Sequence, residues 1–161
     1  MATKPQIQVE IVGDTTGNQN NETRYYYEAS SQDFEKGALV YLASGYVTHC
    51  ESDATLYWGV ARKAATTAQN GIIPVTLITP TTILSICCYH ATAASAITAK
   101  ADVGIKRPLV LVAGKYYIDK TDTSNTSLTV IDFDKRDEIG DIYGKYLVTV
   151  LAADCQTCVG A

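Results

Sequence analysis

Residues 37–50 read GALVYLASGYVTHC, and this stretch decides the expected fold class. Two runs rich in apolar and β-branched residues, 37–42 and 46–50, flank the short turn signal ASG at 43–45. Such an arrangement is typical of a β-hairpin. Similar short runs recur along the chain at spacings of roughly 8–15 residues, without the strand–helix alternation of parallel α/β folds.

The remaining β-rich runs complete an all-β chain. Pro74 predicts that its strand lies at a sheet edge or that the strand starts there, because proline cannot donate a backbone hydrogen bond. Only the alanine-rich residues 91–103 favour a helical turn or a loop. We therefore expect an antiparallel β-barrel or sandwich of about eight to nine short strands. The further predicted strands are residues 56–61, 72–78, 82–89, 109–112, 116–119, 127–133 and 145–151.

Residues 1–34 are predicted to form an extended N-terminal arm. Residues 7–11 alternate apolar and polar side chains as a half-buried strand does, and the polar, Gly/Asn-rich residues 13–23 predict a loop. The arm precedes a β-domain over residues 35–151, and residues 152–161 are read as a C-terminal tail.

Three consecutive tyrosines follow the polar loop. Rings at adjacent strand positions cannot all face one core, so at least one face of this strand is expected to be free for a neighbour. A strand buried on both sides within its own domain is the alternative. Tyrosine also outnumbers phenylalanine, 11 to 2, and tyrosine is favoured at protein interfaces. The predicted protein-interface residues are Ile7, Val9, Ile11, Tyr25, Tyr26 and Tyr27.

Charge and hydropathy argue against two classes of partner. The net charge is -4 and the pI about 5.1, and the basic residues form no cluster larger than a pair such as Arg62-Lys63, so nucleic-acid binding is not expected. The longest apolar stretch, around residues 109–113, is far shorter than the ~20 residues of a membrane-spanning helix. No signal peptide is visible at the N-terminus, so we expect a protein that is made and used without secretion.

A search for catalytic or metal-binding patterns yields little. Cys155 and Cys158 have the spacing of two zinc ligands, but no second pair completes a site, and a disulfide or an inert tail remain open alternatives. The acidic residues 132–141 fail as a calcium-binding loop, because Arg136 and Tyr143 stand where ligands are required. Nucleophile-elbow and phosphate-loop motifs are absent from the sequence. We therefore predict no enzyme activity, no catalytic residue, no cofactor and no metal.

The order of several motifs is similar to a known family. Residues 36–40 (KGALV), 45–47 (GYV), 58–61 (WGVA) and 73–78 (IPVTLI) resemble the β-domain of bacteriophage head decoration (cement) proteins. The resemblance extends over roughly residues 35–151 and its second half is carried by the motifs ADVG at 101–104, GKYYID at 114–119, TDTSN at 121–125, DKRD at 134–137 and LVTVL at 147–151.

This resemblance implies a virion structural protein, made in the host bacterial cytoplasm. It would bind the outer surface of the phage capsid, commonly as a homotrimer, and stabilise the shell by clamping neighbouring subunits of the major capsid protein. The alternative is a carbohydrate- or host-receptor-binding β-domain of a phage tail or fibre. Exposed aromatic rings would favour that alternative, and Trp58, Tyr116, Tyr117 and the loop 132–141 are the candidates for them.

Overall fold

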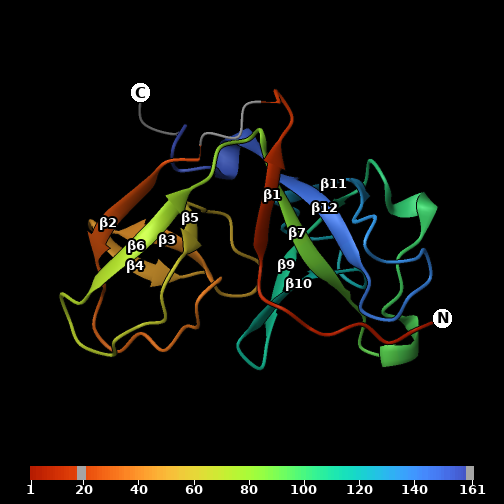
Figure 1. The fold of residues 1–161 in the computed structure, drawn as a ribbon, viewed down its shortest axis with the longest axis horizontal. Coiled ribbons are helices and arrows are strands. Elements are labelled where there is room, and N and C mark those ends of the chain that lie inside the picture. Colours follow the sequence, from red (N-terminus) through yellow and green to blue (C-terminus); the bar gives the residue numbers. More distant parts are fainter. Residues whose placement is uncertain (18–20, 159–161) are drawn as a thin grey trace.

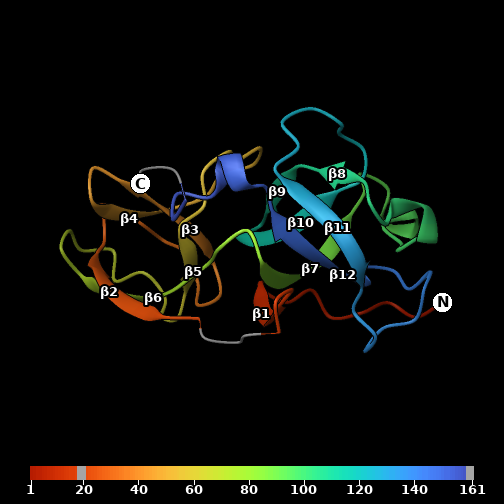
Figure 2. The ribbon, with the colours of Figure 1, turned by 90° about the horizontal axis from the view of Figure 1, so that it is seen from above.

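The computed structural model describes residues 1–17 and 21–158 and confirms an all-β chain built from two sheets (Figure 1). The two sheets lie side by side along the longest axis of the molecule, as the view from above also shows (Figure 2). Residues 18–20 of the predicted polar loop and residues 159–161 of the predicted tail lie outside the described residues.

The larger sheet has seven strands in the order β8-β11-β12-β7-β10-β9, with β1 as an additional partner of β7. One edge of β7 pairs with β12, and the other is shared between β1 in its first half and the parallel strand β10 in its second half. Its strands are β1 (Glu10–Asp14), β7 (Thr82–Tyr89), β8 (Lys106–Arg107), β9 (Leu109–Val112), β10 (Lys115–Asp119), β11 (Leu128–Phe133) and β12 (Lys145–Val150).

A single chain segment closes this sheet into a nearly complete barrel. Strands β8 and β9 follow one another across Pro108, yet β8 pairs with β11 and β9 pairs with β10 at the opposite end of the strand order. Because proline has no backbone N–H, the change of strand partner at Pro108 leaves no N–H group of that residue unpaired. Its carbonyl oxygen still accepts from the Asp119 N–H at 3.1 Å. The predicted barrel or sandwich is thus confirmed in part: one of the two sheets is nearly closed, and its β7–β10 pair is parallel instead of antiparallel.

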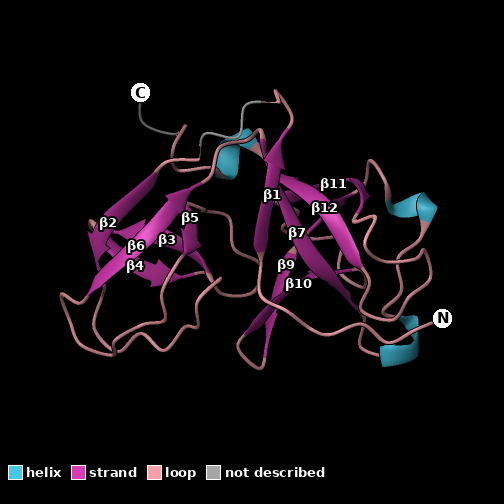
Figure 3. Cartoon of the chain, in the orientation of Figure 1, coloured by secondary structure: helices cyan, strands magenta, loops and turns pink. Residues whose placement is uncertain are grey.

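The smaller sheet has five strands in the order β2-β6-β5-β3-β4 (Figure 3). The predicted hairpin is confirmed, with Val40 paired to His49 and Ala43 paired to Tyr46. Both turn residues have positive φ, 50° at Ser44 and 85° at Gly45, as a tight two-residue hairpin turn requires. The strands are β2 (Thr23–Tyr27), β3 (Leu39–Ala43), β4 (Tyr46–His49), β5 (Gly59–Ala61) and β6 (Ile72–Leu77).

Pro74 does not mark a sheet edge, and that prediction is wrong. Strand β6 lies between β2 and β5, so the proline is inside the sheet. The pairing of β6 with β5 ends at Ala61 and Val75, so Pro74 falls just beyond it. There the Pro74 carbonyl oxygen accepts the Arg62 N–H at 2.8 Å, and no donor is needed from the proline.

Three short 3₁₀ turns are the helical part of the described chain: η1 (Ala93–Ser95), η2 (Lys100–Asp102) and η3 (Ala152–Asp154). The first two lie in the alanine-rich residues 91–103, where a helical turn was predicted. Among the described residues there is no helix with the length and apolar character needed to cross a membrane.

Buried tyrosines join the two sheets. The Tyr116 hydroxyl lies 3.2 Å from the Leu39 carbonyl oxygen and 3.0 Å from that of Cys50, so a barrel strand is bonded to the smaller sheet. A second contact runs from the smaller sheet to the barrel: the hydroxyl of Tyr57, which precedes β5, lies 2.6 Å from Oγ of Ser127, which precedes β11. Burial raises the pKa of both tyrosines, so both hydroxyls stay protonated. Buried side chains of both sheets form one hydrophobic core.

The extended N-terminal arm is not confirmed. The predicted strand over residues 7–11 is shifted to Glu10–Asp14, and it pairs with β7 of the barrel. The side chain of Val9 lies in the core with 4% exposure. The next strand, β2, belongs to the other sheet. Residues 1–34 therefore supply one strand to each sheet. The sequence pattern shows that these residues form strands, but it does not show which strands they pair with, so it cannot distinguish this arrangement from a separate arm.

The first residues of the chain are bonded to a loop near its other end. The backbone of Ile142 donates to the Ala2 carbonyl oxygen at 2.8 Å and accepts from the Lys4 N–H at 2.9 Å. Asp141 accepts the Ala2 N–H at 2.8 Å and pairs with the Lys4 ammonium at 2.9 Å. These bonds to Ala2 and Lys4 lower the pKa of Asp141 to about 2.

Residues 152–158 differ from a free tail. Cys155 is completely buried, and the Thr157 hydroxyl donates to the Ile78 carbonyl oxygen at 2.8 Å. The Gln156 side chain accepts from the Leu42 N–H at 2.8 Å and donates to the Leu42 carbonyl oxygen at 3.0 Å, as a partner strand would. This segment therefore covers part of strand β3.

Replacing Gln156 with alanine tests the contribution of this segment. The variant loses two hydrogen bonds to a half-buried strand, at a cost of about 1–2 kcal/mol. For a chain of this size the melting temperature should fall by roughly 3–6 °C in differential scanning calorimetry. The exposed Gln69→Ala is the matched control and should leave the melting temperature unchanged. Equal melting temperatures for both variants would contradict the assignment.

Candidate functional site

The three tyrosines of β2 divide between the two faces of the strand. Tyr26 points toward the protein interior and packs edge-on against Trp58, with ring centroids 5.9 Å apart. Tyr25 and Tyr27 point outward and are 73% and 57% exposed. The prediction that the three rings cannot share one core is confirmed, and the alternative of a strand buried on both sides is wrong.

An apolar surface surrounds the two exposed rings. In the register of β2 and β6, Tyr25 lies opposite Pro74 and Tyr27 lies opposite Ile72, whose side chain is 53% exposed. Tyr25, Tyr27, Ile72 and Pro74 together are called the aromatic face here. A clustered set of exposed large apolar side chains is characteristic of a surface that binds another molecule.

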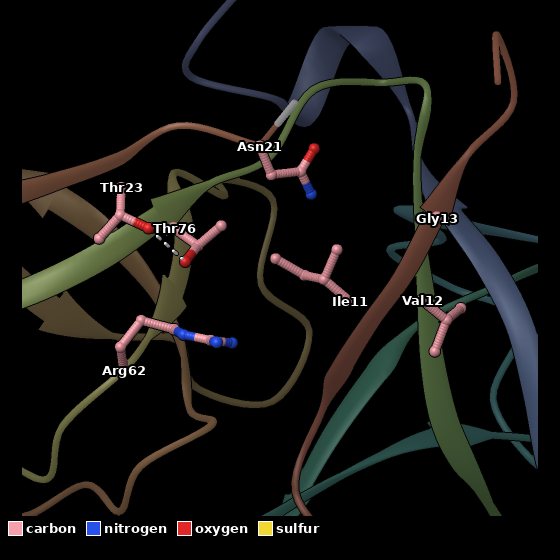
Figure 4. A pocket seen from close by; sticks show the side chains of 7 residues that line it. All are labelled: Ile11, Val12, Gly13, Asn21, Thr23, Arg62 and Thr76. Atoms are coloured by element: carbon pink, nitrogen blue, oxygen red, sulfur yellow. Dashed lines mark hydrogen bonds between the residues drawn. The ribbon is translucent and has the colours of Figure 1, made fainter. Parts of the chain in front are cut away.

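The same face of β2 and β6 continues into a groove. Thr23 and Thr76 are the next outward pair, and their hydroxyls lie 2.9 Å apart. Both line a cavity of about 270 Å³ between this sheet and strand β1 (Figure 4). A second cavity of about 480 Å³ follows it along β1. Because the two cavities share Ile11, Val12 and Arg62, we describe them as one groove.

The groove combines apolar walls with cationic side chains. Ile11 of β1 and Val60 of β5 both line it. The Arg62 side chain extends into the space between β6 and β1 (Figure 4), and the second cavity is also lined by Lys36 and Arg136.

The three cations differ in whether they are neutralised. Arg136 Nε lies 2.9 Å from Asp134 Oδ1, and its terminal nitrogen lies 2.8 Å from Glu10 Oε2. The hydrogen bonds from Arg136 outweigh partial burial and hold the pKa of Asp134 far below its usual value. Arg62 and Lys36 form no ion pair with any described residue. They are the two cations of the groove that remain available to a ligand.

The predicted interface residues of the first strand lie elsewhere than Tyr25 and Tyr27. Ile7 and Ile11 are half-buried and line the groove, whereas Val9 is buried in the core and presents almost no surface. The structure thus places Ile7 and Ile11 on the barrel side of the groove and the exposed tyrosines on the smaller sheet.

The cysteines are poor candidates for chemistry. All five are free thiols, and only Cys158 is exposed. Burial raises the pKa of Cys155 and raises that of Cys88 to about 12, so neither forms the nucleophilic thiolate near neutral pH. Within the described ranges 1–17 and 21–158, no group of three or more His, Cys, Asp or Glu side chains is arranged to hold a metal ion.

The aromatic rings suggested for a carbohydrate site are mostly covered. Tyr116 and Tyr117 are 1% and 3% exposed, and Trp58 is half-buried behind Tyr26. A sugar ring cannot stack on a buried aromatic face, so the suggestion of Tyr116 and Tyr117 as platforms is wrong.

No family model, curated protein or solved structure matches the chain. The candidate site is therefore defined by geometry: the aromatic face and the groove that continues it. Sequence reasoning missed Arg62, Lys36 and Ile72 as members of this surface. The pair Arg62-Lys63 reads as an ordinary solvated pair, and only the tertiary fold brings Arg62 beside Ile11.

Proposed function

We propose that this chain is a structural virion protein, a capsid decoration protein that binds the outer surface of a phage capsid and has no enzyme activity. The observation that supports it best is the aromatic face, with Tyr25, Tyr27 and Ile72 exposed on paired strands. The sequence resemblance over roughly residues 35–151 points in the same direction.

The aromatic face has the chemistry of a protein-binding hot spot. Tyrosine is enriched among the residues that dominate binding energy, because a rigid ring buries much apolar area while its hydroxyl finds a polar partner. Tyr25 and Tyr27 stand two residues apart on one strand face, and Ile72 packs beside Tyr27. A complementary apolar depression on a coat subunit would bury all three side chains.

Binding of this kind stabilises a capsid by mass action. A ligand that binds only the mature shell lowers its free energy by RT ln(1 + [L]/Kd) at each site, and the effect is multiplied over many sites. The proposed partner is the major capsid protein, and a homotrimer would place three aromatic faces around one capsid axis. Because residues 2–14 are held in the barrel, contact with the capsid is assigned to the aromatic face instead of a free arm.

A second candidate function is recognition of a carbohydrate or host receptor by a tail or fibre domain. The observation that favours it is the position of Asn21, Thr23 and Arg62 in the groove next to the exposed ring of Tyr25. Polar side chains beside an exposed ring are a common way to hold a sugar. Retention of the protein on a glycan array, with no binding to capsids, would favour this second function.

The Tyr25→Ser, Tyr27→Ser double variant tests the proposed function. It should bind expanded heads, assembled from the major capsid protein of the same genome, roughly 100-fold more weakly than the unmodified chain. Co-sedimentation with the heads measures this. The control carries Ile105→Ser and Ile139→Ser, two substitutions of exposed apolar residues outside the aromatic face, and should bind normally. Absence of head binding by the unmodified chain would refute the proposal.

A further inference from the structure

Strand β1 leaves one of its edges unpaired. It pairs with β7 from Glu10 to Asp14, and within the described residues it has no other strand partner. Ile11, Val12 and Gly13 of this strand line the groove. The N–H and C=O groups of an unpaired edge can bond a further strand, and proteins usually cover or block such an edge. Here the edge borders an open groove instead.

The groove has the size and lining for a short extended chain. Its two cavities, of about 270 and 480 Å³, lie end to end along β1. Cavities of 300–1,000 Å³ are typical of sites that enclose a small ligand. Across from β1 the groove is lined by Thr76 of β6 and by Arg62, which follows β5; Arg62 is exposed, whereas Thr76 and the neighbouring Val60 present little surface. An inserted strand would therefore meet the Arg62 side chain on this side.

Gly37 lines the second cavity, where the N-terminal segment meets the smaller sheet. It has a φ of +92°, and a Cβ atom added to it would lie 2.6 Å from Gln8 Cβ. The chain before β1 therefore lies directly against the turn that precedes β3, and only glycine permits that approach. The other cavity is lined by Thr23, which leads on to the aromatic face.

The charge of the groove selects an acidic occupant. Glu10, the acidic side chain among the described lining residues, is paired with Arg136, and Arg62 and Lys36 lie unpaired in the groove although the chain as a whole carries a net charge of -4. A guanidinium group binds a carboxylate through two parallel hydrogen bonds, and this geometry discriminates against neutral side chains. Basic and neutral segments would lose this contact.

We propose that the groove receives an extended acidic segment of the partner protein, added as a strand to the free edge of β1. Backbone bonds to β1 supply affinity, and a carboxylate of the segment pairs with Arg62, with Lys36 further along the groove. This inference rests on the proposed protein-binding function, and it adds the chemistry of the partner segment. The segment is extended and acidic, and it belongs to the same partner protein that covers the aromatic face at Tyr25.

The experiment uses an acetylated nonapeptide in which valine alternates with glutamate, titrated into the ¹⁵N-labelled full chain. Backbone amide shifts should change along β1 and at Arg62. Arg62→Gln should weaken binding about tenfold, whereas Lys63→Gln, which removes the same charge outside the groove, should change it less than twofold. A peptide with glutamine in place of glutamate should bind the unmodified chain as weakly as the acidic peptide binds Arg62→Gln.

The outcomes separate this inference from the proposed function. Equal binding of the glutamate and glutamine peptides, or shifts that leave β1 unaffected, would overturn the inference even if the chain binds capsids through its aromatic face. Peptide binding to β1 without any capsid binding would support the groove as a strand-accepting site and refute the capsid function. Glucuronic acid serves as the sugar probe, and a response of Arg62 to it but not to the acidic peptide would overturn the inference in favour of a carbohydrate ligand.

Discussion

Deletion of residues 1–14 is expected to lower the melting temperature of the chain by at least roughly 10 °C. The deletion removes strand β1 from β7, withdraws Val9 from the core and breaks the bonds that join Ala2 and Lys4 to Ile142. Burial of Val9 and partial burial of Ile11 alone are worth about 2–4 kcal/mol, a large part of the total stability of an ordinary domain. The unpaired half of β7 would also promote aggregation.

Thermal unfolding followed by circular dichroism measures this effect. A synthetic peptide of residues 1–14, added to the truncated chain, should restore part of the lost stability, because it can pair again with β7. An unchanged melting temperature after truncation would mean that β1 is a dispensable arm, as the sequence first suggested.

Replacement of Asp102 with asparagine should have the second largest effect, a loss of about 3 kcal/mol. The Asp102 carboxylate is 5% exposed and lies 2.9 Å from the Lys120 ammonium and 3.1 Å from the Arg107 guanidinium. It also accepts the hydroxyl of the buried Tyr146. Burial opposes its ionisation, but the hydrogen bonds from Lys120 and Tyr146 outweigh burial, and the pKa is lowered. Asparagine would leave two largely buried cations without a counter-charge.

Urea unfolding gives the free energy of unfolding for Asp102→Asn directly. The exposed Asp33→Asn removes the same charge without a buried partner and should leave the free energy of unfolding within about 0.5 kcal/mol of the unmodified chain. A similar, small change in both variants would show that the buried ion cluster adds little to stability.

Strands with strong local signals were predictable from the sequence. The bounds Thr82–Tyr89 of β7 coincide with the predicted run, because β-branched and aromatic residues fill it and turn residues flank it. Strand β8 was missed, since two residues carry no periodicity and its pairing depends on the break at Pro108. Residues 152–158 were missed for a similar reason: Gln156 and Thr157 are held by backbone groups of distant strands.

The candidate site was predictable only in part. Alternation along β2 was enough to predict that some of Tyr25, Tyr26 and Tyr27 would face solvent, and the structure shows which two do. The groove could not be predicted, because it lies between β1 of one sheet and β5 and β6 of the other. No local pattern reports that Ile11 and Arg62 will line the same cavity.

The bonds between Ile142 and the first residues also constrain when the chain can fold. During synthesis, β1 has no partner until β7 has been made, and Ala2 and Lys4 have none until Ile142 has left the ribosome. Contacts between residues so far apart in sequence make folding slow, on the millisecond-to-second scale of other all-β domains. Completion of the barrel is therefore expected only after Ile142 and strand β12 have been synthesised, and until then the edge of β7 that pairs with β12 is exposed to aggregation.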